Sequence, residues 1–99
     1  MNKNFITSYY IGLNDKDEHK QLLLTDTYKD KINRVLQAFG KHGFTIVEAQ
    51  GFYKGELENT LIIQLGNIKL DKIIINSLKQ ELNQECIMEV VTPCNVRFI

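Results

Sequence analysis

The sequence predicts an α+β domain of the ferredoxin-like type, in which two helices cover one face of an antiparallel sheet in the order β-α-β-β-α-β. Two observations support this. Residues 44–65 show the alternating polarity of two strands, joined by a tight turn at Lys54-Gly55. On each side of this hairpin lies an apolar stripe at helical spacing, and beyond each stripe lies another strand-like segment. A further short strand is expected at the C-terminus, and residues 1–99 are expected to form one domain.

The hairpin has a definite predicted register. Glycine at the second turn position tolerates a positive φ, so the strands pair across Lys54-Gly55. The pairs are Phe44 with Leu65, Ile46 with Ile63, Glu48 with Leu61, Gln50 with Asn59 and Phe52 with Leu57. Because side chains alternate between faces, one face is apolar and then continues into a polar band of Glu48, Gln50 and Asn59. Either sheet twist carries this band into water, or the band lines a cleft at the open end of the sheet.

The N-terminal part predicts a strand followed by a polar loop. Residues 5–13 alternate in polarity and are rich in Tyr and Ile, which favours a strand. Gly12 within it indicates a bulge, or a close approach by another backbone or a ligand. The loop 14–20 has acidic residues at a spacing superficially similar to a calcium loop, but the glycine and distal glutamate of that motif are missing. A metal site is therefore not expected there.

The first helix is predicted to begin near Thr25 or Thr27, with Asp26 and Asp30 in its first turns, where acidic groups complement the helix dipole. The pattern Thr27-x-x-Asp30 also fits a helix cap. Its core-facing stripe is Tyr28, Ile32, Val35, Leu36 and Phe39, and it ends at Gly40 or Gly43.

The second helix is predicted to follow Asn67, a candidate N-cap. One side of this helix carries Leu70, Ile73, Ile74, Ser77, Leu78 and Leu82. Residues 86–91 then predict a strand, Thr92-Pro93 a break, and residues 96–99 the last short strand. This arrangement leaves one sheet face without helices. Its partly apolar character predicts that a second subunit covers it, as a homodimer or higher homo-oligomer.

The composition excludes several classes of function. Lys plus Arg and Asp plus Glu are both 12, so little nonspecific attraction to duplex nucleic acid or to an anionic membrane is expected. No apolar run is long enough to span a bilayer, and the N-terminus MNKNFITSYY has no signal-peptide core, which predicts a cytoplasmic protein. Cys86 and Cys94 lack metal-site spacing and are expected to be free thiols. No cofactor is implied.

No catalytic motif stands out, so the sequence predicts that the protein is not an enzyme. There is no GxGxxG, GxxxxGK[ST] or GxSxG. Glu56 and Glu58 lie about 7 Å apart on one strand face, a separation that permits acid–base chemistry. A small hydrolase or isomerase using Glu48 or Glu58 with His19 is therefore a minor alternative.

Several short segments resemble a family of small phage proteins, the Thoeris anti-defence sponges. The residues that carry the similarity are 10–17 (YIGLNDKD) with Lys20-Gln21, 45–51 (TIVEAQG), 58–61 (ENTL) and 82–85 (LNQE). The resemblance implies a nonenzymatic protein that sequesters a cyclic ADP-ribose isomer, the signal made by bacterial TIR-domain proteins, and so keeps an anti-phage effector inactive. It also implies oligomers with ligand sites between subunits.

For such a ligand, cations would contact the pyrophosphate and aromatic rings would stack on the base. The phosphate candidates are Lys16, Lys20 and Arg97, the stacking candidates are Phe52, Tyr53 and Phe98, and the candidates for ribose or base edges are Asn14, Gln50 and Asn59. The alternative is a small-molecule sensing module of the ACT or nitrogen-regulator type, which shares the β-α-β-β-α-β order and acts through a protein partner.

Overall fold

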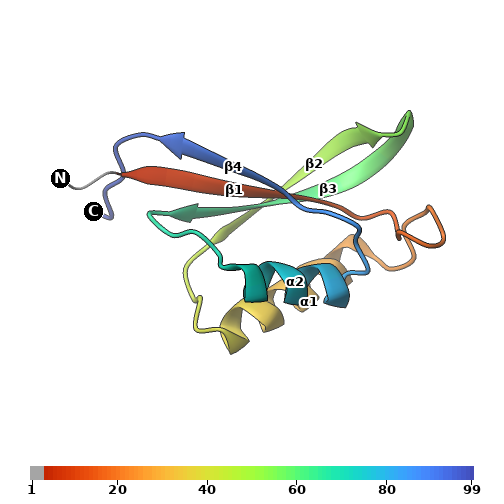
Figure 1. Cartoon of the computed structure of the whole chain (residues 1–99), viewed down its shortest axis with the longest axis horizontal. Coiled ribbons are helices and arrows are strands. Elements are labelled where there is room, and N and C mark those ends of the chain that lie inside the picture. Colours follow the sequence, from red (N-terminus) through yellow and green to blue (C-terminus); the bar gives the residue numbers. More distant parts are fainter. Residues whose placement is uncertain (1–3) are drawn as a thin grey trace.

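The computed structural model of the chain describes residues 4–99. Its elements are β1 (Phe5–Gly12), α1 (Thr25–Ala38), β2 (Thr45–Tyr53), β3 (Glu56–Gly66), α2 (Lys72–Glu81) and β4 (Met88–Pro93). The four strands form one antiparallel sheet in the order β2-β3-β1-β4, and both helices lie on the same face of it (Figure 1). The predicted ferredoxin-like class is confirmed.

The hairpin register is also confirmed. The β2–β3 partners include Ile46 with Ile63, Glu48 with Leu61, Gln50 with Asn59 and Phe52 with Leu57. Lys54 and Gly55 have φ values of 52° and 79°. Two consecutive positive φ values are what a two-residue hairpin turn requires, because the twist of such a turn matches that of the strands. The local turn therefore fixes which side chains share each face.

The hydrophobic core lies between the sheet and the two helices. Its buried side chains are Tyr9, Ile11 and Leu13 from β1 and the residue after it, Leu61, Ile63 and Leu65 from β3, Tyr28, Ile32 and Leu36 from α1, and Leu70, Ile74, Leu78 and Leu82 from α2 and its flanks. Tyr9 is fully buried, and its hydroxyl accepts a hydrogen bond from the Leu70 backbone N–H (2.7 Å) and donates to Glu89 (2.9 Å). Burial, as the largest cause, raises the pKa of Tyr9 to about 12.

The predicted start of the first helix near Thr25 is confirmed, but both predicted helix caps are wrong. Helix α1 begins at Thr25, directly after Leu24, and has no side-chain cap, so Thr27 and Asp30 do not cap it. Helix α2 is capped by Asp71, whose carboxylate accepts from the Ile74 N–H at 3.1 Å. Asn67 bonds the start of β1 instead. Its N–H donates to the Phe5 carbonyl at 2.8 Å and its side-chain oxygen accepts from the Phe5 N–H at 3.0 Å, which closes the end of the β1–β3 ladder.

The C-terminal part differs from the expectation in its boundaries. Strand β4 occupies Met88–Pro93 instead of residues 86–91, and residues 94–99 are not a regular strand. This last segment lies beside the start of β1, where the Cys94 N–H donates to the Asn4 carbonyl at 3.2 Å. Pro93 lies opposite Phe5 on an edge strand, a position that tolerates proline because the missing N–H removes no ladder hydrogen bond.

None of the helices in residues 4–99 combines the length and the apolar character needed to cross a bilayer. Residues 1–3, which belong to the N-terminal stretch considered for a signal peptide, lie outside the described part of the chain.

Candidate functional site

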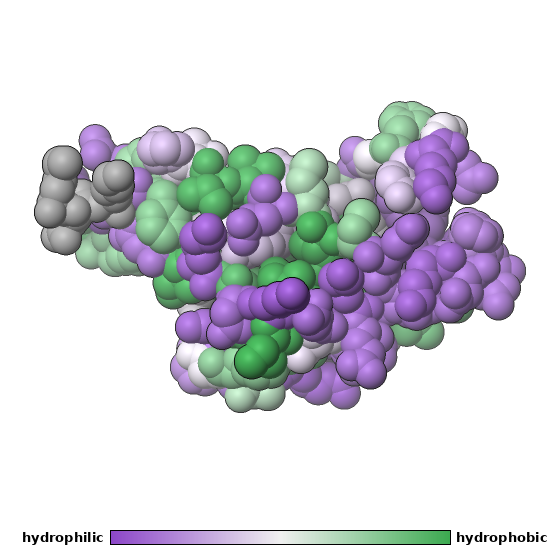
Figure 2. Space-filling view, in the orientation of Figure 1, coloured by the Kyte–Doolittle hydropathy of each residue, from purple (hydrophilic) through white to green (hydrophobic). Residues whose placement is uncertain are grey.

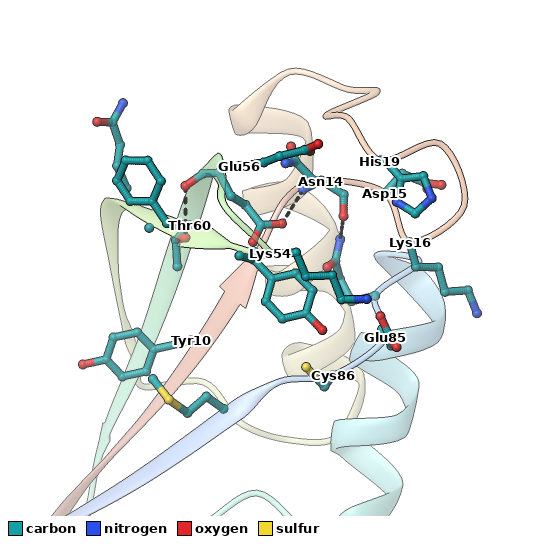
Figure 3. Close-up of a pocket in the computed structure, with 18 of the residues that line it drawn as sticks. Tyr10, Asn14, Asp15, Lys16, His19, Lys54, Glu56, Thr60, Glu85 and Cys86 are labelled. Carbon is teal, nitrogen blue, oxygen red and sulfur yellow. Dashed lines mark hydrogen bonds between the residues drawn. The ribbon is translucent and has the colours of Figure 1, made fainter.

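A cavity of about 630 Å³ opens at the end of the sheet where β1 ends and the β2–β3 turn projects. We call it the hairpin cavity. Its wall consists of Tyr10, Gly12, Asn14, Asp15, Lys16 and His19 from β1 and the following loop, Ala49, Gln50, Gly51, Phe52, Tyr53, Lys54, Glu56, Glu58 and Thr60 from the hairpin, and Gln84, Glu85, Cys86 and Met88 from the segment after α2 (Figure 3). Its volume suits a nucleoside-sized ligand.

The floor of the hairpin cavity belongs to the sheet face without helices. Tyr10 and Gly12 alternate with Tyr9 and Ile11, which are buried in the core, so they point to the opposite face. Cross-strand pairing brings Thr60 next to Gly12 on that face. The hydrophilic loop 14–20 borders it, and Figure 2 shows hydrophilic side chains gathered at this end of the molecule. The cavity therefore has a sheet floor and a polar rim.

Glu58 is fixed in the hairpin cavity by a backbone donor. Its Oε2 accepts a hydrogen bond from the Asn14 backbone N–H at 3.0 Å, and the residue is half-buried. The carboxyl group lies directly over Gly12, so a Cβ at that position would overlap all three of its atoms. A close approach at Gly12 is confirmed, and it is made by the Glu58 side chain instead of by another backbone.

The hairpin cavity carries a net negative charge. Its wall contains four carboxylates, from Asp15, Glu56, Glu58 and Glu85, and two lysines, which leaves two negative charges in excess. The lysine of the turn, Lys54, lies over the ring of Tyr53, with Nζ 5.3 Å from the ring centroid. Negative charge beside aromatic faces favours a cationic ligand with a planar group over an anionic one.

Five of the predicted ligand-binding residues come together here. The structure places Asn14, Lys16, Gln50, Phe52 and Tyr53 in the wall of the hairpin cavity. Ligand contact by these residues stays a prediction.

The other four predicted ligand-binding residues do not line the hairpin cavity: Lys20, Asn59, Arg97 and Phe98. Arg97 and Phe98 belong to the C-terminal segment, which lies at the opposite end of the sheet (Figure 1). There the Phe98 ring is next to Gly66.

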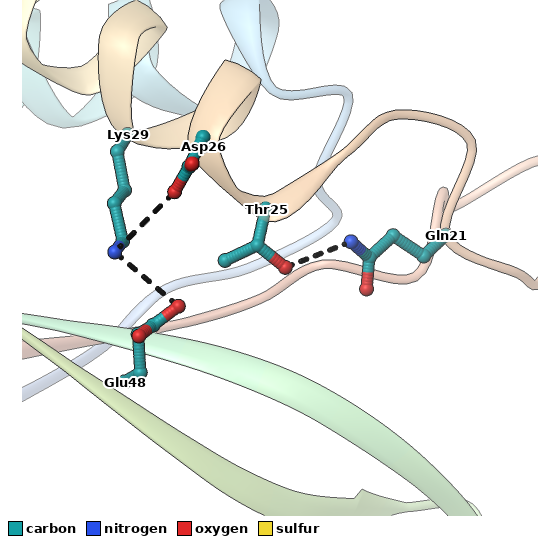
Figure 4. Close-up of polar contacts among 5 residues, drawn as sticks. All are labelled: Gln21, Thr25, Asp26, Lys29 and Glu48. Atoms are coloured by element: carbon teal, nitrogen blue, oxygen red, sulfur yellow. Dashed lines mark hydrogen bonds and ion pairs between the residues drawn. The ribbon is translucent and has the colours of Figure 1, made fainter.

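Two of the three residues of the polar band on the core-side face contact α1 or the loop before it. Glu48 forms an ion pair with Lys29 at 3.3 Å (Figure 4), and the Asn59 amide donates to the Gln21 side chain at 2.9 Å. Gln21 also bonds Thr25, so the loop before α1 is tied to the helix. Of the band, Gln50 alone appears in the cavity wall.

Some residues missed by sequence reasoning, such as Tyr10, lie on the sheet floor, and others come from the segment after α2. Glu85, Cys86 and Met88 line the hairpin cavity because β4 pairs with β1, which brings Met88 opposite Tyr10. The ferredoxin-like strand order places the last strand beside the first, so this contact could have been predicted from the fold class. Glu56, Glu58 and His19, considered above for acid–base chemistry, also line the cavity. Within residues 4–99 there is no cluster of three or more His, Cys, Asp or Glu side chains able to hold a metal ion.

Comparison with known proteins gives a fold but no family. No family model matches the chain, and no curated protein matches it. Two solved structures are similar: a phage SAM lyase in complex with S-methyl-5′-thioadenosine, at 21% identity and a TM-score of 0.64, and a phage SAM lyase in the apo state, at 22% and 0.63. The alignments cover 91% and 92% of this chain and 81% of each lyase chain. They do not confirm the resemblance to the Thoeris sponges.

The prediction that the protein is not an enzyme is contradicted by this comparison, because the similar solved structures are of a lyase. The prediction rested on absent motifs, namely phosphate-binding glycine loops and a nucleophile elbow. Those motifs belong to other folds, so their absence does not argue against chemistry on this one.

Proposed function

We propose that the chain binds S-adenosylmethionine in the hairpin cavity and cleaves it as a lyase. The single observation that carries the proposal is the net negative, tyrosine-containing cavity on a fold shared with the phage SAM lyases. S-adenosylmethionine is a matching ligand, because it joins a planar base to an arm that carries sulfonium and ammonium charges. A cyclic ADP-ribose isomer carries a pyrophosphate instead, and excess carboxylate in the wall disfavours it.

The aromatic side chains would hold the nucleoside. Tyr10 and Tyr53 both line the hairpin cavity, and a ring face can stack on adenine or contact a sulfonium. Cation–π contacts of this kind contribute about 0.5–2 kcal/mol each. The tyrosines would therefore favour the charged substrate over a neutral nucleoside.

Glu58 would orient the amino-acid arm. The sulfonium charge disappears as the carbon–sulfur bond breaks, so a carboxylate held against sulfur would stabilise the substrate more than the transition state. The α-ammonium keeps its charge throughout. We therefore assign Glu58, fixed by the Asn14 N–H and the space over Gly12, to the ammonium. Held in this way, the arm can fold back on itself.

The chemistry needs no reagent besides the substrate. Formation of S-methyl-5′-thioadenosine leaves sulfur with its methyl and adenosyl groups, so the bond that breaks joins sulfur to Cγ of the arm. The substrate carboxylate attacks Cγ and forms the O–Cγ bond of a lactone. The Cγ–S electron pair goes to sulfur, which becomes a neutral thioether, and the ammonium keeps its protons. The protein would contribute mainly orientation, which can provide several kcal/mol of the barrier reduction.

The test is incubation of the purified protein with S-adenosylmethionine, followed by chromatography and mass spectrometry. We expect S-methyl-5′-thioadenosine and the amino lactone in equal amounts, faster than in a protein-free incubation. Glu58→Gln should lower kcat/KM by about tenfold or more, because a charge-assisted contact contributes about 1.5–3 kcal/mol. Asp30→Asn, which removes an equal charge from an exposed position on α1, should leave the rate unchanged.

The outcomes separate the alternatives. If S-adenosylmethionine breaks down no faster with the protein than without it, the proposal is refuted. Depletion of a cyclic ADP-ribose isomer from solution, with its return on heating, would support sequestration of that signal in its place. A lyase of this kind would remove a nucleoside metabolite from an infected cell, and we propose that the chain counters a host defence in this way.

We also propose that the sheet face without helices is covered by another copy of the chain. Val47 and Val90 are 40% and 37% exposed, and Met88 and Tyr53 at the edge of the hairpin cavity are 54% and 46% exposed. Exposed apolar area on one sheet face favours a subunit contact. Light scattering should give a mass above that of one chain, and Val47→Lys with Val90→Lys should return it to the monomer value.

A further inference from the structure

The loop 14–20 is fastened to the end of α2 by side chains distant in sequence. The Asn83 amide donates to the Asp15 carboxylate at 2.6 Å and to the Asp17 carboxylate at 3.0 Å. The Asn83 carbonyl accepts from the Lys16 N–H at 3.1 Å. The next residue, Gln84, donates from its side chain to the Asn14 carbonyl at 3.0 Å. We call these contacts the Asn83 latch.

Asp15 is the centre of the loop. The carboxylate oxygen not bonded to Asn83 accepts from the N–H groups of Asp17 and Glu18, both at 3.0 Å. Its backbone N–H donates to the Lys20 carbonyl at 2.8 Å, and its carbonyl accepts from the His19 N–H at 2.8 Å. The Asn83 hydrogen bond, as the largest cause, also lowers the pKa of Asp15. The loop is thus organised around one carboxylate, and Asn83 holds that carboxylate to α2.

The Asn83 latch reaches the hairpin cavity through Asn14. The N–H of Asn14 donates to Glu58, while its carbonyl is held by Gln84. The backbone before Asn14 is held to β3, where the Leu13 N–H donates to the Asn59 carbonyl at 2.9 Å, and the backbone after it is held by Gln84, so the direction of the Asn14 N–H depends on both. If the latch opens, the loop loses its tie to α2, and the Glu58 carboxylate loses a fixed donor.

We propose that Asn83 is a positioning residue for the reaction: it keeps the loop 14–20 closed beside the hairpin cavity and so keeps the Asn14 N–H on the Glu58 carboxylate. The inference rests on the proposed lyase function. Asn83 touches no reacting atom in this mechanism and acts through Asp15 and Asn14.

Because of where Asn83 lies, its substitution can disturb the position of the loop without unfolding the domain. Residues 16–20 are exposed, so an open loop would expose little additional apolar surface. Asn83 has a φ of 50°, a conformation that asparagine tolerates and that glycine adopts without strain. Asn83→Gly therefore removes the amide while leaving the backbone free to keep its shape.

The principal test compares wild type with Asn83→Gly in S-adenosylmethionine turnover, thermal melting and amide hydrogen exchange. We expect kcat/KM to fall by about tenfold, mostly through kcat, since a misplaced Glu58 loses orientation more than it loses binding. The melting temperature should stay nearly constant, and exchange should accelerate in the loop 14–20. The control is Asn33→Ala on the outer face of α1, since glycine at that position would itself destabilise the helix by about 1 kcal/mol.

Asn83→Asp gives a second, pH-dependent readout. At neutral pH it places a third carboxylate against those of Asp15 and Asp17, with Lys16 as the cation that acts on Asp15, and repulsion should open the latch. Protonation of the new group restores a donor. The ratio of variant to wild-type activity should therefore rise as the pH falls below neutral, whereas the Asn33→Asp ratio should stay flat.

Each result decides between the two proposals. A wild-type protein that leaves S-adenosylmethionine intact overturns the proposed function and the positioning role together. Wild-type turnover that Asn83→Gly leaves unchanged, with a flat Asn83→Asp pH ratio, overturns the positioning role alone. Asn83→Gly could also melt at a much lower temperature than wild type. In that case the activity ratio of Asn83→Asp to wild type, measured as a function of pH below the melting transition, decides the question. A purely structural defect would not be reversed by protonation of one carboxylate.

Discussion

Substitution of Gly12 by alanine is expected to lower activity in the hairpin cavity while changing the stability of the fold little. The new Cβ would lie closer than 3.0 Å to all three atoms of the Glu58 carboxyl group, a separation that real Cβ atoms essentially never show. The neighbour in the way is the end of a flexible side chain, not backbone. Glu58 can therefore swing away, but only by leaving the Asn14 N–H.

The structure gives the size of each effect. Loss of the charge-assisted hydrogen bond costs about 1.5–3 kcal/mol if the carboxylate stays dry, and less at this half-buried site because water can replace the donor. Alanine in place of glycine within a strand returns about 0.5–1 kcal/mol through lower chain entropy in the unfolded state. The two nearly offset each other, so the free energy of unfolding should change by about 1 kcal/mol or less. Activity has no such compensation and should fall by about tenfold or more.

The assay measures S-adenosylmethionine turnover beside thermal or denaturant unfolding. Gly66→Ala is the matched control, because its Cβ would also crowd side-chain atoms, with Phe98 Cζ at 2.9 Å and Val96 Cγ1 at 3.0 Å, but at the other end of the sheet. We expect it to leave turnover unchanged. Equal loss of turnover in both variants, or full turnover in Gly12→Ala, would refute a role for the position of Glu58.

Two further predictions concern stability. Tyr9→Phe leaves the buried Leu70 N–H without its acceptor, so the free energy of unfolding measured in urea should fall by about 1–3 kcal/mol. Tyr10→Phe is the control and should cost much less, because the Tyr10 hydroxyl forms no hydrogen bond within residues 4–99. In the wild type, the Tyr9 contribution should be complete below pH 10 and lost as the pH rises toward about 12, because its folded-state pKa is raised. The pKa of Asp15 is lowered, chiefly by Asn83, so its contribution should be present above pH 3.8 and lost as the pH falls below that value. Acid titration of Asn83→Gly should show a smaller loss, and an equal loss in both proteins would contradict this assignment.

The sequence alone determined the parts of the fold that depend on neighbours in the chain. Alternation over residues 44–65 and a turn at Lys54-Gly55 predict the β2–β3 register, and the structure confirms it. The stripes at helical spacing identify the buried residues Tyr28, Ile32 and Leu36 of α1. These patterns are readable because a two-residue turn and a helical period act over a few residues.

Helix caps are harder to predict from the sequence, because several polar residues near the start of each helix could act as the N-cap. Asn67 has the chemistry of an N-cap but is engaged by the Phe5 backbone, so Asp71 caps α2 instead. Two polar residues thus have equally suitable side chains for the cap, and a long-range contact determines which of them caps the helix. This kind of contact has no short-range pattern in the sequence.

The hairpin cavity depends on tertiary structure for the same reason. Glu58 meets Asn14 across 44 residues, and Asn83 meets Asp15 across 68. Arg97 and Phe98 have the side chains that a nucleotide site uses, yet strand order carries them to the far end of the sheet. The sequence determined which residues could serve a ligand. Only the pairing of β1 with β3 and β4, and the packing of α2 against the loop, decided which of them meet.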